Sequence, residues 1–175
     1  MSRKIILNMA MSLDGYISDN TGGFDWIYGD GNRSLDTKDQ WSYEKFVKEV
    51  DTVVMGHTCF EQKFSEAFSD KKIYVATESH KEDHDNIHFI QDNITKPILE
   101  EMKQDGKNIF LFGGGITIDP FIKANLVDEY VVGIIPIILG KGRTLFQKDN
   151  PRIRLYLDAC YINSGITTLH YKKKI

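Results

Sequence analysis

Small and hydroxyl-bearing residues follow three of the apolar runs in this sequence. They form the segments Gly113-Gly114-Gly115, Gly56-His57-Thr58 and Thr77-Glu78-Ser79. Backbone without Cβ atoms can approach a bulky anion, and the free N–H groups at the start of a helix point toward it. Ligands of open α/β sheets gather beyond the carboxyl ends of the strands, so one dinucleotide could place its phosphates at several such junctions. These segments therefore indicate a dinucleotide site.

Each segment also has a plainer explanation. Three glycines in a row suit a tight turn that needs a positive φ, and their spacing matches neither G-x-G-x-x-G nor the P-loop. Thr58 and Glu61 have capping-box spacing, so a helix that begins after Gly56 explains that junction without a ligand. The dinucleotide hypothesis is favoured because the junctions occur together in one small chain.

Carboxylates near the same edge are the candidates for substrate chemistry. Asp14 precedes Gly15 directly after the first apolar run. Asp25 lies beside Trp26 in a long polar segment, and Glu44 falls in the next predicted helix. A carboxyl group whose pKa is raised by burial could orient a substrate or relay a proton. An Asp before a Gly is more often a turn residue, so both explanations of Asp14 stay open, and Asp25 and Glu44 are weaker candidates.

Histidine and cysteine spacing gives no reason to expect a metal centre. His80, His84 and His88 are four residues apart, but the sequence between them is typical of a solvated loop, on which the three rings would not converge. Cys59 and Cys160 lie far apart with no paired spacing, which is typical of reduced thiols in the cytoplasm. We therefore expect a cytoplasmic protein without a bound metal.

An alternation of strands and helices must position these residues. Apolar runs predict strands over 4–11, 53–55, 72–76, 86–90, 108–112, 129–135, 153–160 and 163–172. Helices are expected from Thr37, where Thr37 and Gln40 have capping-box spacing, after Thr58, over 95–104 with Thr95 as N-cap, and over 116–125. Residues 12–36 lack such a pattern, as is typical of a lid or a binding loop. This order predicts an α/β fold with a mixed central sheet flanked by helices and antiparallel strands at the C-terminal edge.

Composition limits the class of protein further. The chain has 175 residues, of which 41% are hydrophobic and 27% charged, and this fits one domain over residues 1–175. A formal net charge of −3 offers no basic face to nucleic acid. No apolar run approaches the roughly 18 residues of a membrane span. We therefore expect a soluble protein that binds a small molecule, with neither nucleic acid nor a membrane as partner.

The ordered set of motifs resembles the dihydrofolate reductase-like superfamily. It is most similar to the C-terminal reductase domain of the bifunctional deaminase–reductases of riboflavin biosynthesis and to the free-standing relatives of that domain. The opening motif is Ser12-Leu13-Asp14-Gly15-Tyr16-Ile17, and the resemblance continues through 53–61, 112–115, 126–129, 136–142 and 145–146. Each motif alone is weak, whereas their common order is specific.

The resemblance implies a single-domain dihydrofolate reductase-like fold, NADPH as hydride donor, and a homodimer. The nicotinamide would lie near Ala10 and Ile17, with the substrate between the 12–36 segment, Asp14 and the helix at 38–49. The residues that would contact the phosphates and ribose of the cofactor are Gly56, His57, Thr58, Thr77, Ser79, Gly113, Gly114, Gly115, Ile116 and Thr117.

Three sites depart from the family pattern. His57 and Cys59 replace the usual arginine and threonine at the phosphate site, so NADH is not excluded as the cofactor. Gly113 replaces a glutamate of the riboflavin-pathway reductases, and Gln40 falls where dihydrofolate reductases carry an acid, so neither of their substrates is expected. We predict an NAD(P)H-dependent oxidoreductase that transfers a hydride to an unidentified small cyclic substrate. The alternative is a non-catalytic nucleotide- or metabolite-binding protein that retains the fold.

Overall fold

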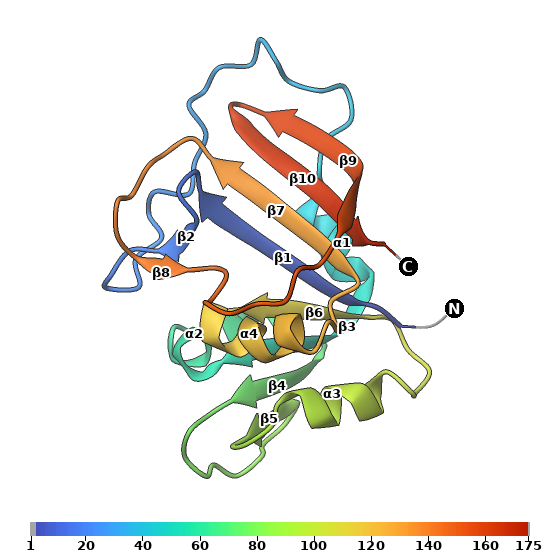
Figure 1. Cartoon of the computed structure of the whole chain (residues 1–175). Helices are drawn as coiled ribbons and strands as arrows, with labels where there is room; N and C mark the ends of the chain where they lie inside the picture. The colour runs from blue at the N-terminus through green and yellow to red at the C-terminus, as the bar shows by residue number, and fades with distance from the viewer. Residues whose placement is uncertain (1–2, 175) are drawn as a thin grey trace.

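An eight-stranded sheet forms the centre of the computed structural model, which describes residues 3–174 (Figure 1). Across the sheet the strands follow the order β5-β4-β3-β6-β1-β7-β10-β9. Their bounds are β1 Ile5–Ser12, β3 Val50–Gly56, β4 Lys72–Ala76, β5 Ile87–Ile90, β6 Asn108–Gly113, β7 Glu129–Ile135, β9 Leu155–Asn163 and β10 Ile166–Lys173.

The pairing confirms the predicted fold class. All neighbours from β5 to β7 pair in parallel, whereas β10 pairs antiparallel with β7 and β9 antiparallel with β10. The centre of the sheet requires strands that are apolar on both faces, and β1 meets this with Ile5, Ile6 and Leu7, all buried. The result is a mixed sheet with its antiparallel strands at the C-terminal edge.

Helices cover both faces of the sheet. The helices α3 (Thr95–Glu101) and α4 (Gly115–Lys123) lie in front of it in Figure 1, and the core on this side includes Leu7 of β1 and Ile118 of α4. The other face carries α1 (Tyr43–Lys48), α2 (His57–Glu61) and the 3₁₀ turn η1 (Phe64–Phe68). Phe46 of α1 packs there on Phe110 with ring centroids 4.8 Å apart. We call this second side the α1 face.

The first predicted helix begins later than the sequence pattern suggested. Helix α1 starts at Tyr43, and its N-cap is Ser42, whose hydroxyl accepts a hydrogen bond from the amide of Lys45. Thr37 and Gln40 do not form a capping box. Both bond instead to the backbone of Ile162 in the edge strand β9, at 3.0 Å from Ile162 N to Thr37 Oγ1 and 3.0 Å from Gln40 Nε2 to Ile162 O. The backbone groups of Ile162, at the open edge of the sheet, have taken the hydrogen bonds that a local helix cap would have made.

The other helix starts also differ in detail. Gly56, rather than Thr58, is the N-cap of α2, and it supplies no side-chain bond. Thr95 is the first residue of α3 instead of its cap, because the Asn93 side chain accepts from both the amide and the hydroxyl of Thr95. The 12–36 segment contributes a strand that was not predicted, β2 (Tyr16–Ser18), which pairs with β8 (Arg143–Thr144) in a separate two-stranded sheet.

Within residues 3–174, the helices are all too short or too polar to cross a membrane.

A buried carboxylate ties three neighbouring strands together. Glu129, at the start of β7, is 7% exposed. It accepts from Lys4 Nζ at 2.6 Å, beside β1, and its other oxygen contacts His170 Nε2 of β10 at 2.8 Å. These hydrogen bonds, from His170 first, lower the pKa of Glu129 to about 2 even though burial acts in the opposite direction.

This pKa predicts a pH-dependent loss of stability in Glu129→Gln. Because the folded-state pKa is depressed, the ionised carboxylate stabilises the fold fully above its unfolded pKa of about 4.3, and that contribution fades as the pH falls toward 2. The variant should lose about 3 kcal/mol of unfolding free energy at neutral pH, and its deficit should shrink steadily below pH 4. Urea unfolding at several pH values measures this. Glu100→Gln, on the exposed side of α3, is the control. A deficit of equal size at neutral and acidic pH would contradict the assignment.

Candidate functional site

The carboxyl ends of β3 and β6 meet the first turn of α4 without intervening side chains. A Cβ on Gly56 would stand 2.6 Å from Oγ1 of Thr117, 3.7 Å from the carbonyl oxygen of Gly113 and 3.8 Å from the amide nitrogen of Gly114. Gly113 has a φ of +118°, which strongly favours glycine, and its peptide bond to Gly114 is cis. We call Gly56, Gly113, Gly114 and Thr117 the glycine cradle. The structure brings together these four residues, which the sequence placed in the cofactor site.

The other predicted cofactor-binding residues nearby differ in whether they contact the cradle. The Cδ1 atom of Ile17, in β2, lies 3.7 Å from the position of a Cβ on Gly114, so this side chain closes the cradle toward β1. Gly115 is buried against the backbone of Thr144. Ile116 is 84% exposed and lines an open depression on the outer side of α4 with Phe146. The Ile116 side chain therefore lies apart from the cradle.

A cation that the motifs did not indicate stands at the start of α2. Lys81 Nζ contacts Nε2 of His57, whose Nδ1 lies 3.7 Å from Glu61 Oε1. Because an ammonium group can only donate, Nε2 of His57 is the acceptor in this contact. The predicted loss of a permanent charge through His57 is thus offset by Lys81, whose only sequence signal is its position shortly after β4.

The end of β4 adds hydroxyl groups beside this cation. Thr77 is buried, and its hydroxyl donates to the carbonyl oxygen of Ser79 at 3.1 Å while accepting from the Ser79 amide at 3.3 Å. Ser79 and Thr58 are exposed. The predicted residues Thr77 and Ser79 are therefore locked to each other in one turn.

A second unexpected cation is Arg143 of β8. Its guanidinium is 3.4 Å from the position of a Cβ on Gly22, and its charge acts on the thiol of Cys59. Burial nevertheless raises the pKa of that thiol, while hydrogen bonds from the Gly56 and Gly114 backbone oppose the rise. Arg143 thus adds a positive charge near the cradle, supplied by a strand far along the chain from both glycine motifs.

These groups form a line across the sheet that fits an extended dinucleotide. The order β4-β3-β6-β1 places the Thr77–Lys81 turn at one end, the glycine cradle in the middle and Ala10 of β1 at the other end. Adjacent strands are about 4.8 Å apart, so the line spans roughly 14 Å. A cation at the β4 end, a second cation near the cradle and bare backbone in the middle suit such a ligand. In the described part of the chain no group of acidic, histidine and cysteine side chains could hold a metal ion.

Asp14 is tied into a turn, and its pKa is lowered, so the condition for a proton relay is not met. Its carboxylate accepts from Ser12 Oγ at 2.7 Å and from the amides of Leu139 and Gly140 at 3.1 and 2.8 Å. The side chain is exposed, and the Ser12 hydroxyl and the two amides hold the pKa of Asp14 below its ordinary value. It stays ionised and holds the loop after β7 against the end of β1, so it is unsuited to supply a proton. A role in orienting the substrate stays a prediction.

The structure does not bring the two weaker acid candidates to the cradle. Asp25 is exposed in the loop beside the buried Trp26. Glu44 lies on the solvent side of α1, where its carboxylate pairs with Lys48 at 2.6 Å and is 80% exposed. A surface ion pair one helical turn apart explains Glu44 without any substrate.

The 12–36 segment forms a fixed wall beside the α1 face. Phe24 packs on Phe64 with ring centroids 5.4 Å apart. Further along, the amide of Gly31 donates to the carbonyl oxygen of Ser164 at 3.3 Å, and the amide of Ser164 donates to Asp36 at 2.7 Å. Figure 1 shows the segment arching over the tip of the β9–β10 hairpin. The predicted binding loop is therefore held at both ends by tertiary contacts.

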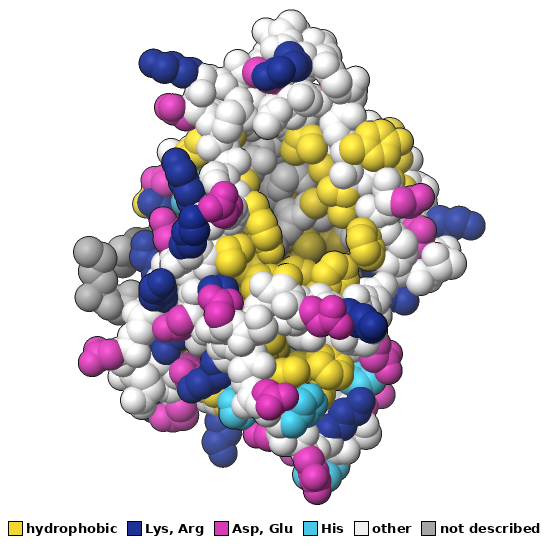
Figure 2. Space-filling view, turned by 180° about the vertical axis from the view of Figure 1, so that it is seen from behind, with side chains coloured by type: hydrophobic (Ala, Val, Ile, Leu, Met, Phe, Trp, Pro, Cys, Tyr) yellow, Lys and Arg dark blue, Asp and Glu magenta, His cyan; other side chains and the backbone are white. Residues whose placement is uncertain are grey.

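The α1 face contains a hollow on the same side of the sheet as the predicted nicotinamide position. Ala10 pairs with Gly133 of β7, Gly133 with Thr168 of β10, and Thr168 with Tyr161 of β9. Paired residues share a face of the sheet, so Ala10, Gly133 and Thr168 form a floor of small side chains. Figure 2 shows this side of the molecule, hollowed in its upper half and bordered by hydrophobic side chains.

This chain is similar to known proteins in both sequence and structure. A model of the RibD C-terminal domain matches residues 3–164. The uncharacterized protein YwjB of Bacillus subtilis is 31% identical, over 98% of this chain and 98% of its own length. A protein provisionally named for riboflavin biosynthesis, from Shewanella sp. PV-4, has a structure that superposes with a TM-score of 0.81 at 24% identity over the whole of both chains. Dihydrofolate reductase from Enterococcus faecalis, in complex with NADP(H), superposes with a TM-score of 0.67 at 14% identity, again over both chains.

The position of Cys59 against the cradle predicts slow alkylation. Because burial raises the pKa of this thiol, little thiolate is present at neutral pH, whereas Cys160 is exposed. In single-cysteine variants, Cys160→Ser should react with N-ethylmaleimide at least about tenfold more slowly than Cys59→Ser. Both should react at equal rates in urea, which serves as the control. Equal rates in the folded protein would show that Cys59 does not pack against Gly56 and Gly114.

Proposed function

Because the chain belongs to the family of the RibD C-terminal domain, we propose that it is an NADPH-dependent reductase that transfers a hydride to a small cyclic substrate. The observation that carries this proposal is the line of groups across the strand ends, from Lys81 through the glycine cradle to Ala10. It matches the length and charge pattern of a dinucleotide, and it ends beside the hollow on the α1 face.

The chain's own residues bind and position the two reactants. Gly56 and Gly114 let the backbone approach the pyrophosphate, and Thr117 offers a hydroxyl beside them. Ile17 and Ala10 flank the nicotinamide, with Ile17 closing the cradle on the side of β2. When bound, the reduced cofactor supplies the hydride, so a C=N or C=O bond of the substrate takes up that hydride and one proton while NADP⁺ is left.

Water supplies the proton in this proposal. Asp14 is held ionised by its hydrogen bonds, and Glu44 faces solvent on the outer side of α1. Gln40, which borders the hollow, has no acidic proton. The protein therefore contributes positioning rather than general acid catalysis, and we expect no steep pH dependence from a protein acid.

Lys81 and Arg143 make the preference for NADPH or NADH testable. NADPH differs from NADH by a phosphate on the adenosine ribose, which the proposed line places at the β4 end, beside Lys81. Arg143 lies nearer the middle, beside Cys59, where both cofactors carry the pyrophosphate. Lys81 should therefore affect the binding of NADPH alone, whereas Arg143 should affect the binding of both cofactors.

Titration of the protein with each cofactor, followed by nicotinamide fluorescence, tests this arrangement. Lys81→Ala should weaken NADPH binding about tenfold and leave NADH binding unchanged, because only NADPH loses a charged partner. Arg143→Gln should weaken both cofactors to a similar extent, by roughly five- to tenfold. Lys103→Ala, which removes a lysine paired with Glu100 on α3, is the matched control.

Two outcomes would contradict the proposal. If neither cofactor binds at millimolar concentration, the chain is not a nicotinamide-dependent reductase. If Lys81→Ala weakens NADH as much as NADPH, Lys81 does not contact the additional phosphate.

None of the residues that line the hollow is acidic, and this favours one alternative: a binding protein that retains the fold without turnover. NADPH oxidation measured over a panel of pterins, flavins and quinones separates the two functions. Tight cofactor binding with no oxidation on any compound would favour the binding protein.

A homodimer is part of the proposal as well. Within residues 3–174, the outer edge of β9 is paired only near Ile162, and Tyr156 and Leu157 on this strand are 43% and 52% exposed. Long open edges are uncommon in monomers, because they invite pairing with another chain. Sedimentation velocity should show a dimer, and Leu157→Lys should shift it toward monomer without loss of helix and strand signals in circular dichroism. A monomeric wild-type protein would contradict this part.

A further inference from the structure

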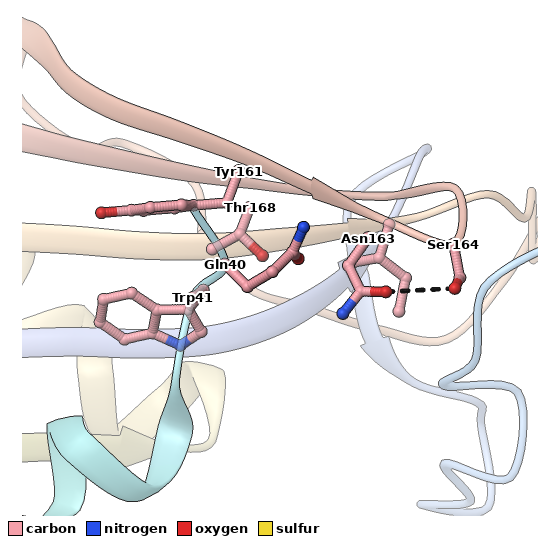
Figure 3. A pocket seen from close by; sticks show the side chains of 7 residues that line it. Gln40, Trp41, Tyr161, Asn163, Ser164 and Thr168 are labelled. Carbon is pink, nitrogen blue, oxygen red and sulfur yellow. Dashed lines mark hydrogen bonds between the residues drawn. The ribbon is translucent and has the colours of Figure 1, made fainter. Parts of the chain in front are cut away.

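We propose that the hollow on the α1 face takes an uncharged planar ring compound with ring carbonyl groups, and that it excludes phosphorylated substrates. The inference rests on the proposed function, because the hydride must reach a molecule held beside the nicotinamide. It names the substrate class, which the family resemblance leaves open. We call this space the Trp41 hollow; its lining residues are Gln40, Trp41, Tyr161, Asn163, Ser164, Ile166 and Thr168 (Figure 3).

The size of the Trp41 hollow suits a ring system. Its volume is about 240 Å³. Sites that enclose a whole drug-sized ligand start at about 300 Å³, so the hollow has room for a ring system, and a chain attached to that ring would extend out of it. Thr168, which lines the hollow, has a short side chain, and Gly133 beside it has none; a Cβ on Gly133 would be 3.8 Å from Thr168 Oγ1.

Trp41 offers a fixed aromatic surface. Its ring packs on Phe46, Tyr161 and His170, with centroids 5.8, 6.1 and 6.1 Å away. At this spacing Trp41 and Tyr161 pack on each other and leave no slot between them, so a guest ring must lie alongside the pair. His170 is itself bonded to Glu129, which keeps this wall in place. A rigid aromatic wall favours a flat guest, because little side-chain freedom is lost on binding.

The polar atoms around the hollow are mostly neutral donors. Nε1 of Trp41 and Nδ2 of Asn163 form no hydrogen bond with any of residues 3–174, and Asn163 uses only its oxygen, toward Ser164. Figure 3 shows Trp41 and Tyr161 at one side of the hollow, Asn163 and Ser164 at the other, and Gln40 and Thr168 between them. Carbonyl oxygens on the guest would accept from these donors.

Gln40 supplies the complementary acceptor. Its amide nitrogen donates to the carbonyl oxygens of Thr37 and Ile162, which fixes the side chain and leaves Oε1 without a partner in the described chain. A ring N–H beside a ring carbonyl would match this oxygen and the donors around it. Gln40 was predicted to cap a helix. The contacts that prevent it from capping are the ones that leave its Oε1 free to bind the guest.

Charge argues against a phosphate. None of the seven lining residues carries a formal charge. At the turn beside the hollow, Asp36 accepts from the Ser164 amide, and the carboxylate of Asp30 fills the space next to Gly165. Arg33 pairs with Asp36 at 3.1 Å, but its own side chain is 79% exposed. A phosphate on the guest would therefore lie at a neutral pocket close to the carboxylates of Asp30 and Asp36, and Arg33 is solvated and already paired.

Riboflavin and its phosphate ester FMN provide a matched pair of probes, because they share one ring system and differ in charge. Binding of each to the full chain is followed by flavin fluorescence, with NADPH binding measured in parallel. We expect riboflavin to bind at least tenfold more tightly than FMN. Thr168→Leu, which adds bulk to the floor, should weaken riboflavin at least tenfold and leave NADPH unchanged, because the cradle lies on other strands. Thr167→Leu, on the opposite face of β10, should change neither.

The outcomes separate this inference from the proposed function. FMN binding as tightly as riboflavin, or neither flavin binding to a protein that binds NADPH, would overturn the substrate class and leave the reductase proposal standing. Riboflavin binding that Thr167→Leu weakens as much as Thr168→Leu would place the ring elsewhere. If riboflavin binds as expected and neither nicotinamide cofactor binds, the ring site stands and the reductase proposal falls.

Discussion

The position of β1 between β6 and β7 determines where every functional group lies. Its parallel register aligns Leu7 with Leu111 on one side and Ala10 with Gly133 on the other. A shift of one residue would turn Ala10 to the opposite face and close the hollow with a methionine. Burial of Ile5, Ile6 and Leu7 on both faces fixes that register, so the core of the strand sets the geometry at its end.

The sequence predicted the sheet because its central strands are short, apolar on both faces and bounded by glycine or polar residues. Helix starts were harder: Thr37 and Gln40 satisfy the local capping pattern but bond to Ile162, 125 residues away from Thr37. The glycine cradle could be predicted because close backbone approach demands particular residue types at particular junctions. The Trp41 hollow could not, since its floor is small residues on strands that become neighbours only through β7 and β10.

Charge beside the glycine cradle illustrates how a cation can come from outside a motif. The sequence departs from its family at His57, which removes a permanent cation from the start of α2. Lys81 returns a cation to that point from the loop after β4, and Arg143 adds another from the small second sheet. Neither lies in a recognisable motif, because an ammonium or guanidinium on a long stem can reach a phosphate from several backbone positions.

Gly133 lies between the predicted nicotinamide position at Ala10 and Thr168 of the Trp41 hollow, and it has no side chain to separate them. A ring lying over Ala10 would become one wall of the hollow, and a ring in the hollow would shield the same edge of the nicotinamide from water. Each ligand would then complete the surroundings of the other, so the two would bind with positive cooperativity. Linkage makes that coupling reciprocal: whatever affinity the substrate gains from the cofactor, the cofactor gains from the substrate. The missing side chain at Gly133 would thereby favour a ternary complex over either binary one.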